Sequence, residues 1–455
     1  MAGLVTGLEV ENFRGLRSVS LPLGPLNVLV GPNGAGKTSF TEVFRFLADS
    51  VTAGLEAALA SRRGFDRILF RGGETEPEAM RIAVWGTWNA GSGHRRPVHG
   101  AAGGGIPDLY EITIRGWRND RKWFLSREEE LRFTAADGAL LGITVREDRA
   151  EITMTGPTGA PPSERASPNS ASPNSARPNS ASPNSARPNS ARPNSASPNS
   201  ASPASAAPTD GGPASASPLT SRPLMFGVRR MSSALSSLGR LDADAGGEQS
   251  AVVAAALASV RPFAVDGEAA RRAGAVPREG GVALEPNAAN LASFLSALRD
   301  THPRVWASLQ ADAVALLPGV IGIDLEPIGF DPVLGLPRRI AVVVYERGLR
   351  YPLTLEEASD GAVRTLALLA ALHDPAPPAL TIIEDVEAGP HPGGYARLVH
   401  RLRKASGRTQ ILATTRSPGF AERLAAEETI SCDRWADGSA GPAPLRPPSA
   451  ASSGW

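Results

Sequence analysis

Near the N-terminus the sequence reads Gly31-Pro32-Asn33-Gly34-Ala35-Gly36-Lys37-Thr38. This stretch fits the pattern G-x-x-x-x-G-K-[ST], in which glycines let consecutive backbone N–H groups turn toward phosphates. In such a loop Lys37 reaches the β and γ oxygens and the Thr38 hydroxyl ligates Mg²⁺. The residues expected to hold the nucleotide are Gly31, Asn33, Gly34, Ala35, Gly36, Lys37, Thr38 and Ser39. We therefore expect ATP and Mg²⁺ as cofactors.

The residues on both sides of this loop have the pattern that a phosphate-binding loop requires. Residues 26–30 form the run Leu-Asn-Val-Leu-Val, which is typical of a buried central strand. After the loop, Phe40, Val43, Phe44 and Leu47 recur at helical spacing. The sequence thus predicts a strand, a glycine-rich turn and a helix whose positive N-terminal end faces the phosphates.

A second apolar strand, at residues 379–383, ends in two carboxylates, Glu384 and Asp385. Phosphate-binding loops require an acidic partner for the metal at the end of another strand. Thr38 and a carboxylate at the end of this strand are therefore expected to hold the metal ion. Most of the chain separates the glycine-rich loop from these two carboxylates, and this sequence separation is far greater than in compact GTPases and kinases.

Between these motifs the pattern of the chain changes several times. Residues 81–85, 110–115 and 151–154 alternate apolar and polar side chains, which predicts an antiparallel β lobe, with a loop at 91–105. From about residue 250 onward, the sequence predicts a series of helices and strands. Helices are expected near 250–260, 288–299, 362–372, 394–405 and 418–426, and strands at 339–345, 379–383 and 409–413.

Residues 163–222 are of low complexity, with Pro-Asn-Ser recurring every five residues from Pro168 to Pro198. A segment with so few large apolar side chains cannot bury enough surface to fold, so we expect a disordered linker. The predicted organisation is an N-terminal half-domain, the linker, a C-terminal half-domain and a disordered tail. Their bounds are 1–162, 163–222, 223–435 and 436–455.

Composition limits the remaining classes of protein. The formal net charge is +1, so no overall field draws the chain toward nucleic acid or acidic lipid. One cysteine, Cys432, excludes an intramolecular disulfide and a cysteine-rich metal site. No apolar run approaches the ~18 residues of a membrane span. The first residues lack a basic segment followed by an apolar one. We expect a cytoplasmic protein without a membrane partner.

Four motifs in order resemble the RecF/SMC-like AAA-type ATPases. The opening Leu8-Glu9-Val10-Glu11-Asn12-Phe13-Arg14-Gly15-Leu16 resembles the start of that family. Residues 384–392, Glu-Asp-Val-Glu-Ala-Gly-Pro-His-Pro, resemble its "EEPENGLHP" segment, and residues 414–418, Thr-Thr-Arg-Ser-Pro, resemble "TTHSP". Ser359-Asp360-Gly361 with Arg364 resembles the abbreviated signature motif. The resemblance implies an α/β P-loop NTPase of the ABC/RecF/SMC-head type, with a mostly parallel central sheet and an antiparallel β lobe.

The resemblance also implies roles for individual residues. Glu384 would hold the Mg²⁺ shell and Asp385 would polarise the attacking water. Ser359 and Gly361 would contact the γ-phosphate of ATP held by a second subunit, so an ATP-dependent homodimer is the implied partner. Ser359 or Asp360 also suits the N-cap of a helix beginning near residue 362, whose positive end favours phosphate. His391 is either an interface residue, as in the family, or a turn residue before proline.

The chain departs from this family pattern at three places. Asp385 stands where the family has glutamate, and Arg416 replaces the histidine that senses the γ-phosphate. No glutamine lies between the P-loop and the linker, so a transporter cassette is disfavoured. Arg416 can still bind phosphate oxygens as a cation. Two hypotheses therefore remain: a slow ATPase with Asp385, Glu384 and Arg416 as its catalytic residues, or a hydrolysis-deficient nucleotide-gated switch. DNA repair or phage defence, with nucleic acid or a co-encoded effector as partner, is implied by the resemblance alone.

Overall fold

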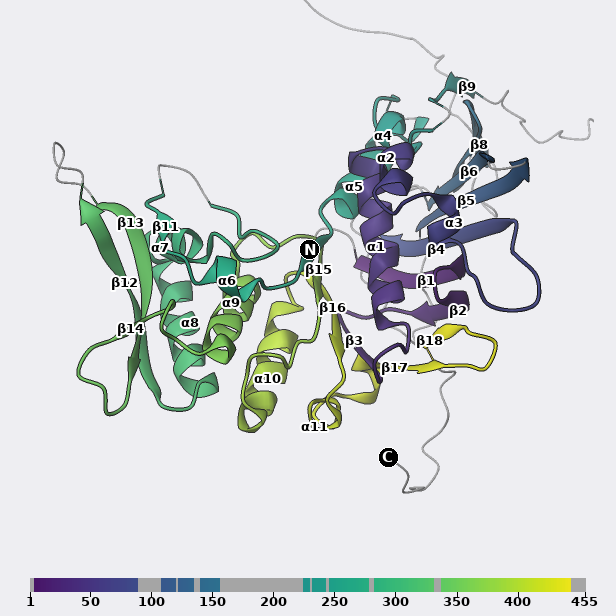
Figure 1. Ribbon diagram of the computed structural model, residues 1–455. Helices are drawn as coiled ribbons and strands as arrows, with labels where there is room; N and C mark the ends of the chain where they lie inside the picture. Colours follow the sequence, from purple (N-terminus) through teal and green to yellow (C-terminus); the bar gives the residue numbers. More distant parts are fainter. Residues whose placement is uncertain are drawn as a thin grey trace, which may run out of the picture. The chain divides into compact units, whose positions relative to one another are not determined.

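The structure is a computed structural model of the chain (Figure 1). It describes residues 4–88, 108–119, 122–134, 140–155, 224–229, 231–242, 245–277, 282–330 and 337–442. The predicted loop at 91–105, the predicted linker at 163–222 and the end of the predicted tail, residues 443–455, lie outside these stretches.

An eight-stranded antiparallel sheet forms the predicted β lobe, in the order β2-β1-β4-β5-β6-β7-β8-β9. Its strands are β1 Leu4–Phe13, β2 Leu16–Pro22, β4 Ala79–Thr87, β5 Asp108–Asn119, β6 Lys122–Thr134, β7 Leu140–Arg146, β8 Arg149–Thr155 and β9 Leu224–Gly227. Ile112 and Ile114 of β5 are buried while Glu111 and Thr113 are only partly so, because successive side chains point to opposite faces. Leu224 pairs with Ile152, so a strand from beyond the predicted linker completes this sheet.

The central sheet has six strands in the order β10-β15-β16-β3-β17-β18. They are β10 Arg261–Phe263, β15 Leu380–Ile383, β16 Gln410–Thr415, β3 Leu26–Val30, β17 Thr429–Arg434 and β18 Ala440–Pro442. The first five strands run parallel, and only β18 is antiparallel to its neighbour. The expected α/β class, with a mostly parallel sheet and an antiparallel lobe, is confirmed.

A smaller sheet, β11-β13-β12 with β14 on β13, and the helices complete the described fold. Its strands are β11 Gly274–Ala275, β12 Val320–Phe330, β13 Pro337–Glu346 and β14 Leu353–Thr354. The helices are α1 Lys37–Thr52, α2 Leu55–Ala60, α3 Phe65–Ile68, α4 Leu235–Leu238, α5 Gly247–Ala258, α6 Gly267–Ala270, α7 Leu291–Thr301, α8 Pro303–Leu316, α9 Asp360–His373, α10 Tyr395–Ala405 and α11 Pro418–Ala421, with 3₁₀ turns η2 Pro392–Gly394 and η3 Ala426–Glu428. Helix α8 and strand β12 were not predicted, and the helix expected at 418–426 is shorter.

Two hydrophobic cores share the central sheet. Leu412 of β16 packs into one core with α1, and α5 lies alongside α1 in the same core (Figure 1). Ile411 and Ala413 face the opposite way and join the core of α7 to α10. Because side chains alternate across a strand, one apolar run supplies both cores. Helices therefore cover both faces of the sheet, and the carboxyl ends of its strands are left at one edge.

The C-terminal part of the described chain is ordered further than the sequence predicted. Residues 436–442 were assigned to the tail, but they form the turn after β17 and strand β18. Asp437 and Ser439 close the turn with a hydrogen bond from the Ser439 N–H to Asp437 Oδ1 at 2.9 Å. The small residues of this segment suggested a frayed end. Small side chains such as that of Ala440 instead let the segment pack closely against the glycine-rich loop at Gly36.

Candidate nucleotide-binding site

Three adjacent strands end at the same edge of the central sheet. Val30, the last residue of β3, pairs with Thr415 of β16, and Ile383 of β15 pairs with Ala413. The glycine-rich loop, Arg416 and Glu384 follow directly after these three strand ends. Because ligands of open α/β sheets bind outside the carboxyl ends of the strands, this edge is the candidate site.

The glycine-rich loop has the backbone geometry that its glycines allow. Gly34 and Gly36 have φ angles of 84° and 85°, in the left-handed region that favours glycine. Lys37, which is 8% exposed, donates hydrogen bonds from Nζ to the carbonyl oxygens of Gly31 at 2.6 Å and Pro32 at 2.8 Å. The ammonium group is therefore held against the loop backbone, where a phosphate oxygen would compete for it.

The other residues expected to bind the nucleotide lie around the first turn of α1. Asn33 and Thr38 are exposed, Ser39 is half-buried, and Ala35 is buried with its N–H bonded to the Pro32 carbonyl at 3.3 Å. The exposed Thr38 hydroxyl and Asn33 amide are accessible to a ligand. Ala35 helps to stabilise the turn of the loop through its backbone hydrogen bond to Pro32.

Glu384 is brought beside α1, as the sequence predicted for a metal ligand. Its Oε1 accepts hydrogen bonds from Thr41 Oγ1 at 3.3 Å and from Arg45 at 3.0 Å. Thr41 lies one helical turn after the expected ligand Thr38. The Arg45 guanidinium, whose Nε is buried without a hydrogen-bond partner, was not singled out from the sequence. It gives the Glu384 carboxylate a cationic partner that a metal ion would have to displace or share.

Asp385 follows in a constrained backbone conformation. Its φ is 47°, and its N–H donates to Thr414 Oγ1 at 3.0 Å. Aspartate and asparagine tolerate this region better than longer side chains. The local backbone thus gives a physical reason for aspartate at a position where the resembling family has glutamate. The Asp385 carboxylate itself is exposed.

Arg416 is exposed at the end of β16, and its backbone is tied to the loop that follows β15. The Arg416 N–H donates to Glu387 Oε1 at 2.9 Å, while Glu387 Oε2 is buried without a hydrogen-bond partner. Glu387 was part of a recognised motif but received no role from the sequence. It fixes the spacing between the two loops that carry Asp385 and Arg416.

Ser359 and Gly361 lie at the start of α9, beside the loop that follows β15. Ser359 caps α9 by accepting a hydrogen bond from the Ala362 N–H at 3.2 Å, and a Cβ on Gly361 would lie 3.1 Å from the Gly389 carbonyl oxygen. Helix α9 packs mainly on α6, α7, α8 and α10. Among the described residues, no hydrogen bond or ion pair joins Ser359 or Gly361 to residues 31–39. His391 caps the η2 turn, with its Nδ1 accepting from the Gly393 N–H at 3.1 Å.

The β17–β18 hairpin lies against the glycine-rich loop, which the sequence did not reveal. A Cβ on Gly31 would collide with the Cys432 carbonyl, and a Cβ on Gly36 would lie 2.8 Å from the backbone of Ala440. Burial raises the pKa of the Cys432 thiol to about 12, against the opposing effect of Lys37. The Asp437-Gly438 pair is a turn signal that could have indicated this hairpin.

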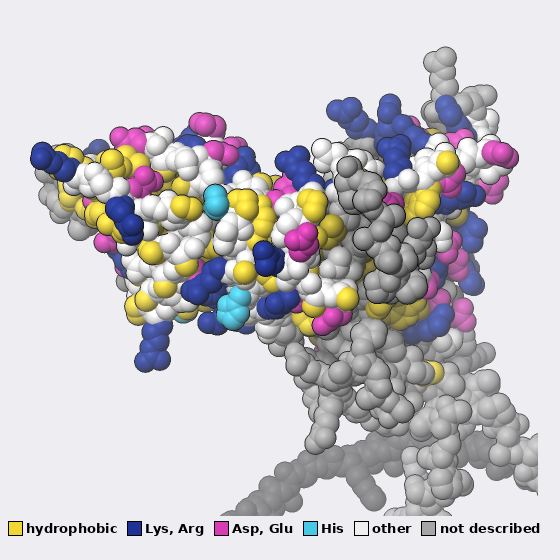
Figure 2. Space-filling model, turned by 90° about the horizontal axis from the view of Figure 1, so that it is seen from below, with side chains coloured by type: hydrophobic (Ala, Val, Ile, Leu, Met, Phe, Trp, Pro, Cys, Tyr) yellow, Lys and Arg dark blue, Asp and Glu magenta, His cyan; other side chains and the backbone are white. Residues whose placement is uncertain are grey.

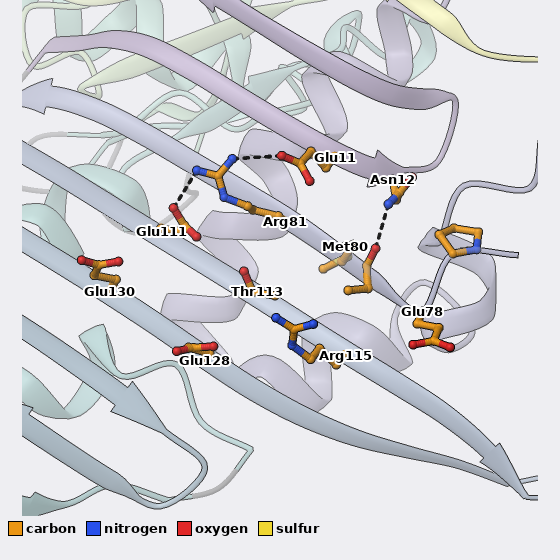
Figure 3. Close-up of a pocket in the computed structure, with 12 residues that line it drawn as sticks. Glu11, Asn12, Glu78, Met80, Arg81, Glu111, Thr113, Arg115, Glu128 and Glu130 are labelled. Atoms are coloured by element: carbon orange, nitrogen blue, oxygen red, sulfur yellow. Dashed lines mark hydrogen bonds and ion pairs between the residues drawn. The ribbon is translucent and has the colours of Figure 1, made fainter.

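Another hollow lies on the outer face of the antiparallel sheet (Figure 3). It measures about 580 Å³, and one of the two arginines in its lining, Arg81, is paired with carboxylates. Arg81 contacts Glu111 at 2.8 Å, Glu9 at 2.9 Å and Glu11 at 3.2 Å, and the hydrogen bond that Arg81 donates to Glu111 is the main reason that the pKa of Arg81 is raised. Five carboxylates and only two arginines line this hollow, and the excess of negative charge opposes phosphate binding, so this hollow is not the candidate site.

Basic and acidic side chains are interspersed over the described surface seen in Figure 2. This mixture agrees with the net charge of +1. Within the described residues, no helix is both long enough and apolar enough to cross a lipid bilayer.

Family models match both parts of the chain that contribute to the central sheet. Residues 5–64 match the model described as "AAA ATPase domain", and residues 262–422 match "AAA domain, putative AbiEii toxin, Type IV TA system". The first range contains the glycine-rich loop, and the second contains Ser359, Glu384 and Arg416. Among curated proteins, the OLD nuclease of Thermus scotoductus is 46% identical over 50 residues, which is 11% of this chain and 10% of that protein. The chain thus spans about a tenth of the length of this curated relative.

Solved structures with similar coordinates include heads of SMC proteins. An SmcHead bound to the C-winged helix domain of ScpA has 13% identity and a TM-score of 0.45, covering 95% of each chain. The SMC head domain from Thermotoga maritima has 12% identity and a TM-score of 0.39, covering 98% of this chain and all of that one. A Pyrococcus yayanosii Smc head with a coiled coil and joint has 10% identity and a TM-score of 0.45, covering 98% and 97%.

Proposed function

We propose that this chain, an AAA-type P-loop ATPase, binds ATP with Mg²⁺ at the edge where β3, β16 and β15 end, and hydrolyses it slowly. One observation carries the proposal. The order β15-β16-β3 brings Lys37, Arg416 and Glu384 to the ends of three neighbouring strands, although they are far apart in the sequence. A cation, a phosphate-binding loop and a carboxylate at one edge are the parts that phosphoryl transfer requires.

Each residue of this edge has a distinct role in the proposal. Lys37 leaves the carbonyls of its own loop and binds the β and γ oxygens, while Thr38 and Glu384 hold the metal ion. Asp385 orients the attacking water, and Arg416 stabilises charge at the γ-phosphate. The metal supplies charge neutralisation when it is bound.

Pairing of two chains around ATP is the second part of the proposal. Within the part of the chain that the structure describes, Ser359 and Gly361 make no hydrogen bond to residues 31–39, and Ser359 is exposed at the N-terminus of a fourteen-residue helix. The free N–H groups and the positive dipole end of α9 favour a phosphate supplied from outside the chain. A two-fold pair would place each α9 on the nucleotide of the other chain.

A nucleotide-gated switch with negligible turnover is the alternative. Arg45 occupies the Glu384 carboxylate at 3.0 Å, Asp385 is one methylene shorter than glutamate, and Arg416 is a permanent cation. All three features favour ATP binding over ATP hydrolysis.

As the partner that responds to the nucleotide cycle, we propose nucleic acid or a partner effector protein, in DNA repair or phage defence. Added DNA that accelerates phosphate release would support the first partner, and unchanged release would oppose it.

Lysine substitutions test the site directly. Lys37→Ala should weaken ATP binding about ten- to a hundred-fold, because a charge-assisted hydrogen bond to phosphate contributes about 1.5–3 kcal/mol. Titration with a fluorescent ATP analogue measures the affinity. Lys404→Ala, which removes an exposed lysine from α10, is the matched control and should bind as the wild type does. Equal affinities for Lys37→Ala and wild type would refute the assignment of the loop.

A further inference from the structure

Arg434 is a basic residue at the glycine-rich loop to which neither sequence motif nor family pattern gave a role. A Cβ built on Gly34 would lie 3.7 Å from Arg434 Nη1, and among the described residues this guanidinium is the only non-adjacent group within 4 Å of that point. Arg434 is exposed, and within the described chain it forms no hydrogen bond or ion pair through its side chain. A cation therefore lies over the loop without a protein anion to satisfy it.

The pairing of β17 explains why Arg434 reaches this position. Residues 429–431 of β17 run parallel to residues 28–30 of β3, so the two strands stay in register up to the loop. There β3 turns away at Gly31 while β17 continues for three more residues. Cys432 passes beside Gly31, and Arg434 arrives beside Gly34.

The hairpin that carries Arg434 is anchored at several points. The Ala440 N–H donates to the Gly15 carbonyl at 2.7 Å, and the Gly73 N–H donates to the Asp437 carbonyl at 3.0 Å. Arg17 forms an ion pair with Asp437 at 2.9 Å. These contacts hold the β17–β18 hairpin against the antiparallel lobe. The position of Arg434 is therefore fixed by these contacts and by the pairing of β17 with β3.

Arg416 and Arg434 lie on opposite sides of β3, and among the described residues neither guanidinium has a hydrogen-bond or ion-pair partner. Arg416 follows β16, on the side of Glu384, whereas Arg434 ends β17, on the other side. The metal and the γ-phosphate belong to the Glu384 side, because Thr38 and Glu384 hold the metal in the proposal above. A cation on the opposite side meets the part of the nucleotide that lies farther from the metal.

We propose that Arg434 binds the α- or β-phosphate of the nucleotide and so completes the site from the C-terminal hairpin. This inference rests on the proposed ATP site. A guanidinium forks onto two phosphate oxygens, which an ammonium group cannot do. Arg434 would thus hold ATP and ADP alike, while Arg416, on the γ-phosphate side, would distinguish them.

Binding of ATP and of ADP to a small set of variants tests the inference. Arg434→Ala should lose about ten-fold in affinity for both nucleotides, and Arg434→Lys should recover part of the loss. Arg416→Ala should weaken ATP more than ADP. Arg304→Ala, at an exposed arginine of α8, is the matched control and should leave both affinities unchanged. Melting temperatures of the unliganded variants show whether the hairpin remains folded.

The outcomes separate the inference from the proposed function. If the wild type binds ATP and Arg434→Ala binds both nucleotides equally well, the inference is overturned and the ATP site stands. A loss confined to ATP would place Arg434 at the γ-phosphate and would also overturn it. If the wild type binds neither nucleotide, both the inference and the proposed function fail.

Discussion

At the scale of single residues, backbone conformation and charge pairing limit what the proposed nucleotide site can do. The φ of 47° at Asp385 suits aspartate and asparagine, so glutamate there would add strain of about 1–2 kcal/mol. Glu384 is paired with Arg45, and Arg416 presents a fixed cation where a neutral imidazole would be expected. In the proposed mechanism these three features act on the attacking water, the metal ion or the γ-phosphate, and none acts on Lys37. These features should therefore weaken ATP binding less than they slow ATP hydrolysis.

A double substitution tests whether the chain is an enzyme or a switch. We expect wild-type turnover well below the ~1 s⁻¹ lower end of typical enzymes. Asp385→Glu combined with Arg416→His should raise the turnover despite the backbone strain at residue 385, because a longer base and a neutral sensor position water better, while ATP affinity changes little. Steady-state phosphate release by wild type, both single variants and the double variant is the measurement. Brisk wild-type turnover that the double change slows would make Arg416 a working catalytic residue and rule out the switch.

At the scale of elements, three helices are joined by a buried polar cluster. Asp312 of α8 accepts from Arg397 of α10, and it contacts His373 of α9 at 3.0 Å and Arg401 of α10. His373 and Asp312 are each only 2% exposed. Because Ser359 is the N-cap of α9, this cluster helps to fix the direction in which the helix presents its N-terminus.

The cluster predicts a pH dependence of stability. Burial, together with the Arg401 charge, lowers the pKa of His373 to about 4, below the 6.5 of an unfolded histidine. The folded state therefore favours neutral His373, so its contribution is complete above pH 6.5 and is lost as the pH falls toward 4. The loss is at most about 1.4 kcal/mol for each pH unit.

Urea unfolding at pH 7.5 and pH 5 measures this effect. The free energy of unfolding of the wild type should fall between the two values, and His373→Gln, which keeps a donor toward Asp312, should show a smaller fall. An equal fall in both proteins would mean that other groups produce the pH dependence.

At the scale of the whole molecule, the predicted linker interrupts a sheet between neighbouring strands. Strand β8 ends at Thr155, β9 begins at Leu224, and the two strands pair directly. Deleting residues 166–216 leaves enough chain to join them. We expect unchanged ATP affinity and a melting temperature equal to or slightly above that of wild type, because closing a shorter loop costs less entropy. A melting temperature lower by many degrees would show that the repeat packs on the folded part.

The proposed pairing of two chains is also tested on the whole molecule. Asp385→Asn should slow hydrolysis without strain, because asparagine tolerates a positive φ. Light scattering should then detect dimers with ATP and monomers with ADP. Adding Ser359→Arg to this variant should abolish the dimer by blocking the N-terminus of α9. Dimers that ignore the nucleotide, or no dimers in either case, would contradict pairing through ATP.

Local sequence determined much of the fold because periodicity and turn chemistry act over a few residues. The run at 26–30, the glycines after it and the helical spacing from Lys37 predicted β3, the loop and α1, and alternation predicted strands of the β lobe. The P-loop motif and the acidic strand end were likewise visible as short patterns. Their roles in binding and catalysis stay predictions until the variants above are measured.

Other features depend on contacts between residues far apart in the chain, which no local pattern encodes. The order of β3, β16 and β15 follows from pairing between distant strands. The partner of Glu384 is Arg45, a residue of α1 that no motif marks. The approach of Arg434 to Gly34 requires the register of β17 on β3 together with the small residues that let the hairpin lie on the loop. Packing of the folded chain decided these positions, because only there do the side chains meet.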